Sequence, residues 1–328
     1  MAKTLYLLNS SRLERKDNTL HWISDKGEKY IPIVAVRDIK VFGEIELNKR
    51  LLEFLNEYDI PMHFFNYYGY YVGTFYPRSS LNSGLITIKQ TEHYINREKR
   101  LYLAKSFVLG GALNILKNIN YYQRRGVHEI KPIADEIESK LVEIHSQEDV
   151  VSLMHLEGEL RNLYYKSFDF IIDDFPFEKR TKRPPKNPLN AMISFGNSLL
   201  YTTILSEIYR THLDPRIGYL HETNQRSFTL NLDIAEVFKP IIVDRVIFQL
   251  VNRKQINDDH FEKAIGFTAL NEKGKEIFIK AFEDKLNTTI KYRNLGSVSY
   301  RKIIRIECYK LYKHFLEEDV YKPFVSDW

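Results

Sequence analysis

Cysteine is almost missing from this chain, because Cys308 is the single one among 328 residues. One cysteine excludes an internal disulfide framework and a cysteine-rich zinc site, and it is typical of a reducing compartment. Long apolar runs are missing too, since no stretch approaches the ~18 consecutive apolar residues of a membrane-spanning helix. The first residues, MAKTL, lack the charged and apolar regions of a secretory signal. We therefore expect a cytoplasmic protein that does not enter a membrane.

Glycine-rich phosphate loops of the GxxxxGK[ST] and GxGxxG types are also absent. Their absence weighs against a nucleoside triphosphatase and against a nicotinamide-dependent enzyme. The chain is rich in apolar residues instead, with 44% hydrophobic residues and 22 tyrosines. This content is enough to build one large domain or two ordinary domains with real cores.

Positive charge is concentrated in two segments, although the net charge is only +5. Residues 88–125 carry eight Lys or Arg against two Glu, which makes this segment more positive than the whole chain. A second run, KRTKRPPK, covers residues 179–186. Such clusters attract polyanions through counterion release, although Lys and Arg can also merely solvate a helix face. The residues that we expect to bind DNA are Arg97, Lys105, Lys179, Arg180, Lys182 and Arg183.

The hydrophobic pattern divides the chain into a β-rich part and a helical part. Short alternating or apolar runs lie at 4–8, 20–23, 30–34, 39–41 and 62–65, with one helix around 48–58 and a Tyr/Gly-rich hairpin at 67–76. The polar segment 77–84 marks a boundary, after which the 3.6-residue period predicts helices at 87–124, 131–145, 147–174, 188–212, 233–253, 274–290 and 298–317. The sequence therefore predicts an α+β protein with a β-rich domain over 1–78, a linker over 79–86 and an all-α domain over 87–328.

Glu157 lies at the edge of the apolar stripe of one predicted helix. A carboxylate there is partly desolvated and needs a partner, which an ordinary i,i+4 ion pair with Arg161 would provide. Gly158 is harder to explain in this way, because a glycine inside a helix costs about 1 kcal/mol relative to alanine. Its presence suggests that a phosphate or a metal site approaches the backbone.

Glu236 and His221 lie in two other segments, and each has an ordinary explanation too. Asp233 and Glu236 have the D-x-x-E spacing of a helix-capping box. Pro240 cannot donate to the carbonyl of Glu236, so we expect a kink and a free acceptor there. Lys239 has the right spacing to reach a phosphate oxygen. His221 follows a turn at 214–215 and precedes a polar segment, where a histidine is more often a surface residue than a ligand.

Taken together, these three side chains suggest a metal site. Two carboxylates and one imidazole suit Mn²⁺ or Mg²⁺ better than they suit a sulfur-rich zinc site. A divalent ion on a protein with two basic clusters is typical of chemistry on a phosphodiester.

The same segments, in this order, resemble the CRISPR-associated endonuclease/integrase, the larger of the two widespread spacer-adaptation proteins, in the version of type I systems. The matching residues are Glu157-Gly158 with Arg161 and Tyr164-Tyr165, NPLNA at 187–191, DPRIGYLH at 214–221, SFTLNLDIAE at 227–236, Lys239-Pro240 and Val243-Asp244-Arg245. No short piece is diagnostic, but the ordered set is specific and spans nearly the whole chain.

The resemblance implies an N-terminal β-sandwich-like domain, which we expect to mediate dimerisation, and a larger α-helical catalytic domain. It also implies that Glu157, His221 and Glu236 bind the divalent ion and form the catalytic site. Residues that would support these ligands or bind phosphate are Asp233, Lys239, Arg161, Tyr164 and Asn190. The implied partners are double-stranded DNA (a captured fragment and the CRISPR repeat), a second copy of the chain and a small ferredoxin-like adaptation protein.

The resulting hypothesis is a metal-dependent DNA endonuclease/integrase. It would insert foreign DNA fragments, or spacers, into a CRISPR array by attack of a 3′-hydroxyl on a phosphodiester, and with water as the nucleophile it would act as a nuclease. A non-catalytic DNA-binding scaffold is the alternative, and its DNA binding would not respond to a chelator. A hydrolase of small phosphate esters is a third possibility, but it would need no long basic surface.

Overall fold

The structure is a computed structural model that describes residues 2–78, 81, 83–223 and 228–327. Its internal contacts divide the chain into two compact units, residues 1–82 and residues 83–328. The first unit is rich in strands and the second is largely helical, which confirms the predicted α+β class. None of the helices in the described ranges is both long enough and apolar enough to cross a membrane.

The N-terminal unit contains two four-stranded sheets. The first has the order β1-β5-β7-β8 and consists of β1 (Lys3–Leu7), β5 (Val36–Val41), β7 (Met62–Phe65) and β8 (Tyr71–Phe75). The second has the order β4-β3-β2-β6 and consists of β4 (Gly27–Pro32), β3 (Thr19–Ser24), β2 (Ser11–Lys16) and β6 (Ile45–Leu47). A 3₁₀ turn at Ile33–Ala35 and the helix α1 (Lys49–Glu57) complete the unit.

Both sheets and α1 bury side chains in one hydrophobic core. Leu7 and Ile39 come from the first sheet, Leu13 and Leu20 from the second, and Leu51 from α1. Alternation along each strand directs one set of side chains to this core, as expected for a sandwich-like pair of sheets. The sequence pattern missed β2, whose residues are mostly polar, and β6, which has only three residues.

The segment 67–76, predicted to be a whole hairpin, contains only the second strand and most of the turn of the observed hairpin. β7 and β8 are its two strands, and Asn66 begins the turn between them. The Asn66 Oδ1 atom accepts hydrogen bonds from the backbone N–H groups of Tyr68 (3.1 Å) and Tyr70 (2.9 Å). A side chain that bonds the backbone in this way is typical of a tight turn.

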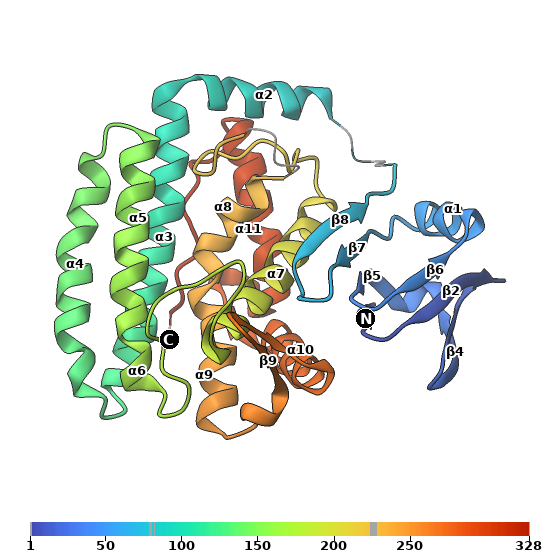
Figure 1. Cartoon of the computed structure of the whole chain (residues 1–328). Coiled ribbons are helices and arrows are strands. Elements are labelled where there is room, and N and C mark those ends of the chain that lie inside the picture. The colour runs from blue at the N-terminus through green and yellow to red at the C-terminus, as the bar shows by residue number, and fades with distance from the viewer. Residues whose placement is uncertain (1, 79–80, 82, 224–227, 328) are drawn as a thin grey trace. The chain divides into compact units, whose positions relative to one another are not determined.

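The second unit is a largely helical domain, as Figure 1 shows, and its described residues include two small hairpins. Its first helices are α2 (Gly84–Ile95), α3 (Arg97–Gln123), α4 (Lys131–Ser146), α5 (Val150–Lys166), α6 (Phe168–Ile171) and α7 (Pro188–Ile208). The remaining ones are α8 (Leu230–Phe238), a π-helical turn (Pro240–Asp244), α9 (Arg245–Asn252), α10 (Glu272–Asn287) and α11 (Tyr300–Phe315). The hairpins are β9 (Phe261–Ala264) with β10 (Phe267–Leu270), and β11 (Thr289–Lys291) with β12 (Ser297–Ser299). Single 3₁₀ turns lie at His128–Ile130, Asp258–His260 and Arg293–Leu295.

Capping side chains explain where the structure departs from the predicted helices. The predicted helix 87–124 is broken at Asn96, whose Oδ1 accepts a hydrogen bond from the Lys99 N–H (2.9 Å) and so starts a new helix. Asp149 caps α5 in the same way through the Ser152 N–H (2.8 Å). The predicted helix 233–253 begins earlier, at Leu230, and contains the π-helical turn.

Helix α3 lies at the centre of this unit and contacts α4 and α5 on one side and α8 on another (Figure 1). Gly110 and Gly111 allow the close approach of α8. A Cβ atom on residue 111 would lie only 2.9 Å from the carbonyl oxygen of Glu236. Since this contact is with backbone, a larger side chain would push α8 away from α3.

We predict that Gly111→Ala destabilises the protein by about 1–3 kcal/mol, because the added methyl group overpacks the α3–α8 contact. Gly158→Ala is the matched control, since a Cβ atom at that position has no neighbour within 4 Å. This second change should stabilise α5 by up to about 1 kcal/mol. Urea unfolding of both variants measures the two effects. Equal unfolding free energies for the two variants would contradict the close packing described here.

Candidate functional site

Glu236 lies on α8 in the interior of the helical unit, with only 3% of its surface exposed. Asp233, one turn earlier, is fully buried on the same helix. The helix begins at Leu230, so Asp233 does not cap it and the predicted capping box is wrong. The Asp233 carboxylate is directed instead to the irregular segment that precedes α8.

Asp233 holds the segment that carries His221. Its carboxylate accepts hydrogen bonds from the backbone N–H groups of Tyr219, Leu220 (3.1 Å) and His221 (2.9 Å). The same carboxylate lies 2.8 Å from the Nδ1 atom of His221. An N–H at Nδ1 leaves Nε2 as the free ring nitrogen, and Nε2 lies 4.0 Å from the Oε1 atom of Glu236. His221 is therefore a fixed side chain beside Glu236 and not a surface histidine.

Arg161 of α5 connects the carboxylates of this region. Its Nη2 donates to Oε2 of Glu236 (2.9 Å), and its Nε lies 3.6 Å from Oε1 of Glu157. Its Nη1 lies 3.8 Å from Oδ2 of Asp244. The predicted i,i+4 pair with Glu157 is present, but Arg161 also joins α5 to α8 and to the π-helical turn.

Lys239 supplies a second positive charge to Glu236, because its Nζ donates to the Oε1 atom of that carboxylate. Burial opposes ionisation of Glu236, but Lys239, Arg161 and His221 together lower the pKa of this carboxyl to about 2. Glu236 is thus an anion despite its burial. For His221, burial is likewise opposed by the bond to Asp233 and by nearby carboxylates, which raise the pKa of the imidazole.

Glu157 reaches the same place from α5, with 26% of its side chain exposed. Burial and the negative charge of Glu236 raise the pKa of the Glu157 carboxyl, against the opposing effect of Arg161. The Arg161 guanidinium contacts both carboxylates, at 2.9 Å for Glu236 and 3.6 Å for Glu157, and the His221 Nε2 atom lies 4.0 Å from Glu236. The structure therefore brings together all three side chains that the sequence analysis selected as ligands.

The helix after Glu236 is interrupted at Pro240, as expected, and two carbonyls beside the interruption have partners that the sequence analysis missed. Asn114 of α3 donates to the carbonyl of Val237 (2.9 Å), and Asn118 donates to the carbonyl of Pro240 and to the Tyr164 hydroxyl oxygen (2.9 Å). The π-helical turn then directs Asp244 toward Arg161, and burial raises the pKa of Asp244 to about 7. Polar residues in apolar surroundings are the signal that could have identified these partners in the sequence. Asn114 and Asn118 lie on a buried helix, and Asp244 follows an apolar run.

The basic loop at 179–186 is held next to this site by Asn190, which is fully buried. Its Oδ1 accepts hydrogen bonds from Nη1 of Arg180 (2.9 Å) and from the Thr181 N–H (3.1 Å), and its Nδ2 donates to the Lys179 carbonyl (2.8 Å). Burial of its ammonium group and the charges of Arg180 and Lys239 lower the pKa of Lys182, although its side chain as a whole is exposed.

Burial distinguishes the two roles that the sequence analysis left open for Tyr164 and Asn190. Both are fully buried and bonded within the protein, which favours a supporting role over contact with phosphate. The other predicted DNA-binding residues divide into two groups. Arg97 and Lys105 donate to the carbonyls of Glu148 (3.0 Å) and His145 (2.7 Å), where α4 leads into α5. Lys179 and Arg183 have exposed side chains on the loop.

The donor set fits a divalent ion in its chemistry, but its present arrangement is that of an ion-paired cluster. Two carboxylates and an imidazole whose Nδ1 is bonded to a carboxylate are the usual components of such a site. Across the described ranges, no three His, Cys, Asp or Glu side chains are placed to hold a metal ion. The ammonium of Lys239, bonded to Glu236, provides the positive charge that an ion would bring.

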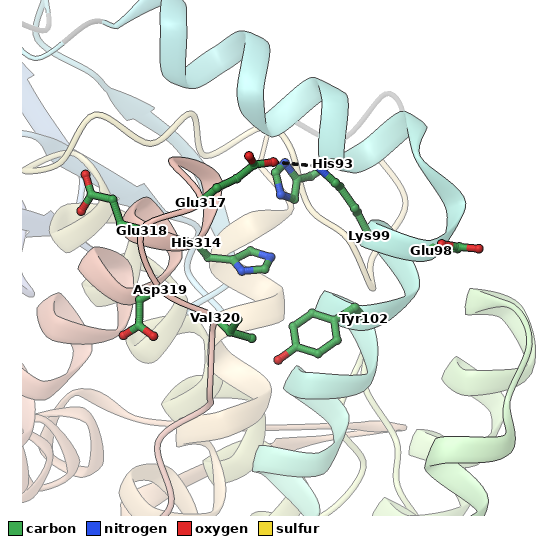
Figure 2. Close-up of a pocket in the computed structure, with 9 residues that line it drawn as sticks. All are labelled: His93, Glu98, Lys99, Tyr102, His314, Glu317, Glu318, Asp319 and Val320. Carbon is green, nitrogen blue, oxygen red and sulfur yellow. Dashed lines mark hydrogen bonds and ion pairs between the residues drawn. The ribbon is translucent and has the colours of Figure 1, made fainter.

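A pocket of about 580 Å³ lies elsewhere in the helical unit and contains none of the predicted site residues. It is lined by His93, Glu98, Lys99, Tyr102, His314, Glu317, Glu318, Asp319 and Val320 (Figure 2). Lys99 and Glu317 form an ion pair of 3.0 Å across its edge, and the rings of Tyr102 and His314 are stacked with centroids 5.7 Å apart. Its carboxylates point in different directions in Figure 2, so they form no common binding site.

Comparison with known proteins agrees with this architecture. The family model described as CRISPR associated protein Cas1 matches residues 5–284. A CRISPR-associated endonuclease Cas1 of Thermodesulfovibrio yellowstonii is 54% identical over 331 residues, and the match covers all of both chains.

Solved structures give the same result. The structure of a CAS1 protein from Thermotoga maritima matches with a TM-score of 0.89 and 48% identity, covering 98% of this chain and 100% of that one. A casposase bound to integration product matches with a TM-score of 0.86, covering 99% of this chain and 94% of that one, and at 20% identity it shows the fold alone. Because the family model spans most of the chain and the relatives match from end to end, the chain belongs to the Cas1 family of CRISPR-associated proteins.

Proposed function

We propose that this protein is a DNA endonuclease/integrase of CRISPR spacer adaptation that depends on Mn²⁺ or Mg²⁺. The name of its 54%-identical relative, an endonuclease, supports the reaction class. The observation that carries the proposal is the meeting of Glu157, His221 and Glu236, which come from α5, from the segment before α8 and from α8. A buried Glu236 carboxylate with a pKa near 2 remains an anion in any physiological buffer.

In this proposal Glu157, His221 and Glu236 hold the divalent ion. When bound, the ion would polarise a phosphodiester and stabilise the attacking or leaving oxygen. Asp233 keeps the His221 proton on Nδ1 and directs Nε2 to the ligand position. Lys239 and Arg161 offset the negative charge of the carboxylates and of an incoming phosphate.

The reaction is a transesterification of DNA. The 3′-hydroxyl oxygen of a captured fragment loses its proton and forms a bond to a phosphorus atom at the repeat boundary. The bond from that phosphorus to the 3′-oxygen of the preceding nucleotide breaks, and this oxygen takes up a proton. The number of phosphodiesters is unchanged, so no external energy source is needed, which agrees with the lack of a nucleotide-binding loop. Attack by water at the same phosphorus gives nuclease activity instead.

DNA would reach the site over the basic loop. Lys179, Lys182 and Arg183 expose their side chains there, and Arg180 holds the loop to α7 through Asn190 and through Ser194 (3.0 Å). Contacts of this kind position a duplex without reading its sequence. A homodimer and a small ferredoxin-like adaptation protein are the partners that family membership leads us to expect.

We predict that Glu157→Ala abolishes divalent-ion-dependent joining of DNA fragments to a supercoiled plasmid that contains the repeat. Loss of a group that only orients a ligand costs about 10–100-fold, so loss of a ligand should cost at least about 100-fold. EDTA should have the same effect on the wild-type protein. The assay counts joined products in Mn²⁺ and in chelator.

Glu159→Ala is the matched control for that experiment. Glu159 lies two residues away on α5 but pairs with Lys140 (2.9 Å), so its loss should leave joining unchanged. A Glu157→Ala protein that joins DNA at the wild-type rate in Mn²⁺ would overturn the metal site. If the wild-type protein binds DNA equally well with and without chelator and joins none in either condition, the protein is a scaffold.

The basic loop yields a second prediction. Lys182→Gln should weaken binding to duplexes of any sequence, and it should reduce the slope of log affinity against log salt by about 0.9, the value for one phosphate contact. Lys280→Gln, on the exposed face of α10, is the control and should not change the slope. Fluorescence anisotropy over a salt series measures both. If the slope for Lys182→Gln is unchanged, Lys182 does not contact DNA phosphate and the proposed role of the loop is wrong.

A further inference from the structure

His221 does not lie on a helix or a strand, so something outside its own segment must fix its position. It belongs to the connection between α7 and α8, which the structure describes over 209–223 and 228–229. Asp233 bonds the segment at residues 219–221 from the side of α8. Hydrogen bonds around a metal ligand orient it, so a second attachment of this backbone would further restrict the position of His221.

Gln90 of α2 provides that second attachment. Its side chain is fully buried, and its amide pairs with both backbone groups of a single residue. The Oε1 atom accepts a hydrogen bond from the N–H of Asp214 (2.7 Å), and Nε2 donates to the carbonyl oxygen of Asp214 (3.1 Å). This pairing is possible at one register only, because a shift of the segment by one residue would break both bonds.

The backbone of α2 and the start of α3 hold the same segment near its other end. The Tyr219 hydroxyl donates to the carbonyl oxygen of Gln90 (3.0 Å), and Nε of Arg100 donates to the carbonyl oxygen of Tyr219 (3.1 Å). The buried Tyr219 ring stacks on Phe315 of α11, with centroids 5.5 Å apart. Gln90 therefore touches the segment at both residues 214 and 219, two positions before His221.

The turn between these two attachments has hydrogen bonds of its own. The position of Asp214 therefore affects the positions of the residues that follow it. The Asp214 carboxylate accepts hydrogen bonds from the Arg216 N–H (2.9 Å) and from the Arg216 guanidinium. The carbonyl oxygen of Pro215 accepts from the N–H groups of Thr229 and Leu230 (3.0 Å each), which begin α8. A displacement at Asp214 would thus move the segment relative to α8, where Asp233 and Glu236 lie.

If Gln90 only filled space in the core, a buried amide would be less favourable there than an apolar side chain. Its two polar groups must be desolvated, which costs free energy unless both find partners, and an apolar side chain of the same length would avoid that cost. Gln90 uses both groups on the segment that carries His221 and neither on its own helix.

We infer that Gln90 is a positioning residue for the reaction. By fixing Asp214 it sets the place of the His221 imidazole relative to Glu157 and Glu236. The inference rests on the proposed metal site. It extends that site to α2, a helix that no ligand comes from and that begins at the boundary between the two units.

The test uses Gln90→Met, which keeps the length of the side chain and removes both hydrogen bonds. Mn²⁺ affinity, measured by titration calorimetry on the full-length protein without DNA, should fall about tenfold, the lower end of the range for groups that orient a ligand. Plasmid joining at subsaturating Mn²⁺ should fall in parallel and recover in part at high Mn²⁺. Gln249→Met, at an exposed position of α9, is the matched control and should change neither quantity.

Gln90→Glu is the second variant, and it tests the positioning role of Gln90 if Gln90→Met does not fold. The glutamate keeps the acceptor for the Asp214 N–H but places a carboxylate oxygen opposite the Asp214 carbonyl, so it should also weaken Mn²⁺ binding. A double-mutant cycle separates positioning from general stability. In a His221→Ala background, either Gln90 change should alter Mn²⁺ affinity by less than about twofold, because the side chain that Gln90 positions is gone.

The outcomes distinguish this inference from the proposed function. If His221→Ala weakens Mn²⁺ binding and the Gln90 variants do not, Gln90 has only a structural role and the inference is wrong. A Gln90 effect of equal size with and without His221 leads to the same conclusion. If His221→Ala and Glu157→Ala both leave Mn²⁺ affinity unchanged, the metal site itself is wrong.

Discussion

The charge of Glu236 is the constraint on which the rest of the site depends. A carboxylate that is only 3% exposed would be neutral without partners, and it is an anion here because Arg161 and Lys239 bond both of its oxygens. Each partner adds a requirement of its own. Arg161 must come from α5, so α5 must pack beside α8. Lys239 must follow one turn after Glu236, so the helix must continue to that residue and can be interrupted only at Pro240. The ion pairs therefore specify both the packing and the place of the break.

Helix α3 compensates for the interruption of the neighbouring helix at Pro240. Two asparagines of α3, Asn114 and Asn118, donate to the carbonyls of Val237 and Pro240, so the interruption leaves these buried acceptors satisfied. The π-helical turn then places Asp244 near Arg161, opposite Glu236. Arg161 thus lies among three acidic side chains, which come from α5, α8 and the turn, and it bonds Glu236 of α8 directly. Such an arrangement has one well-defined position for the guanidinium, which in turn gives Glu157 and Glu236 defined positions.

Sequence patterns predicted the elements of this fold better than the contacts between them. Periodicity gave the helices around Glu157 and Glu236, because apolar side chains at 3- and 4-residue steps report which face is buried. It could not show what a buried polar group touches. Asp233 was interpreted as a helix cap, whereas its partners lie 12–14 residues earlier in an irregular segment. The Gln90–Asp214 contact spans 124 positions and leaves no periodic pattern in either segment. From the sequence, both basic clusters were equally good candidates for DNA binding. In the structure Arg97 and Lys105 bond backbone carbonyls, whereas Lys179, Lys182 and Arg183 of the loop are exposed.

Lys239 and Arg161 balance the charge of Glu236, and under the proposed function they would also allow the cluster to bind a cation and a phosphate. Their positive charges neutralise Glu236, and the Arg161–Glu236 ion pair of 2.9 Å joins α5 to α8. In the proposed function Glu157, His221 and Glu236 would hold a divalent ion, whose charge would compete with the ammonium of Lys239 for the Glu236 carboxylate that Arg161 also bonds. The released ammonium, still beside Tyr201 (5.3 Å to the ring centroid), would then be free to bond a phosphate oxygen. Binding of the ion and of the phosphate would therefore favour one another, because each relieves a charge that the other leaves unpaired.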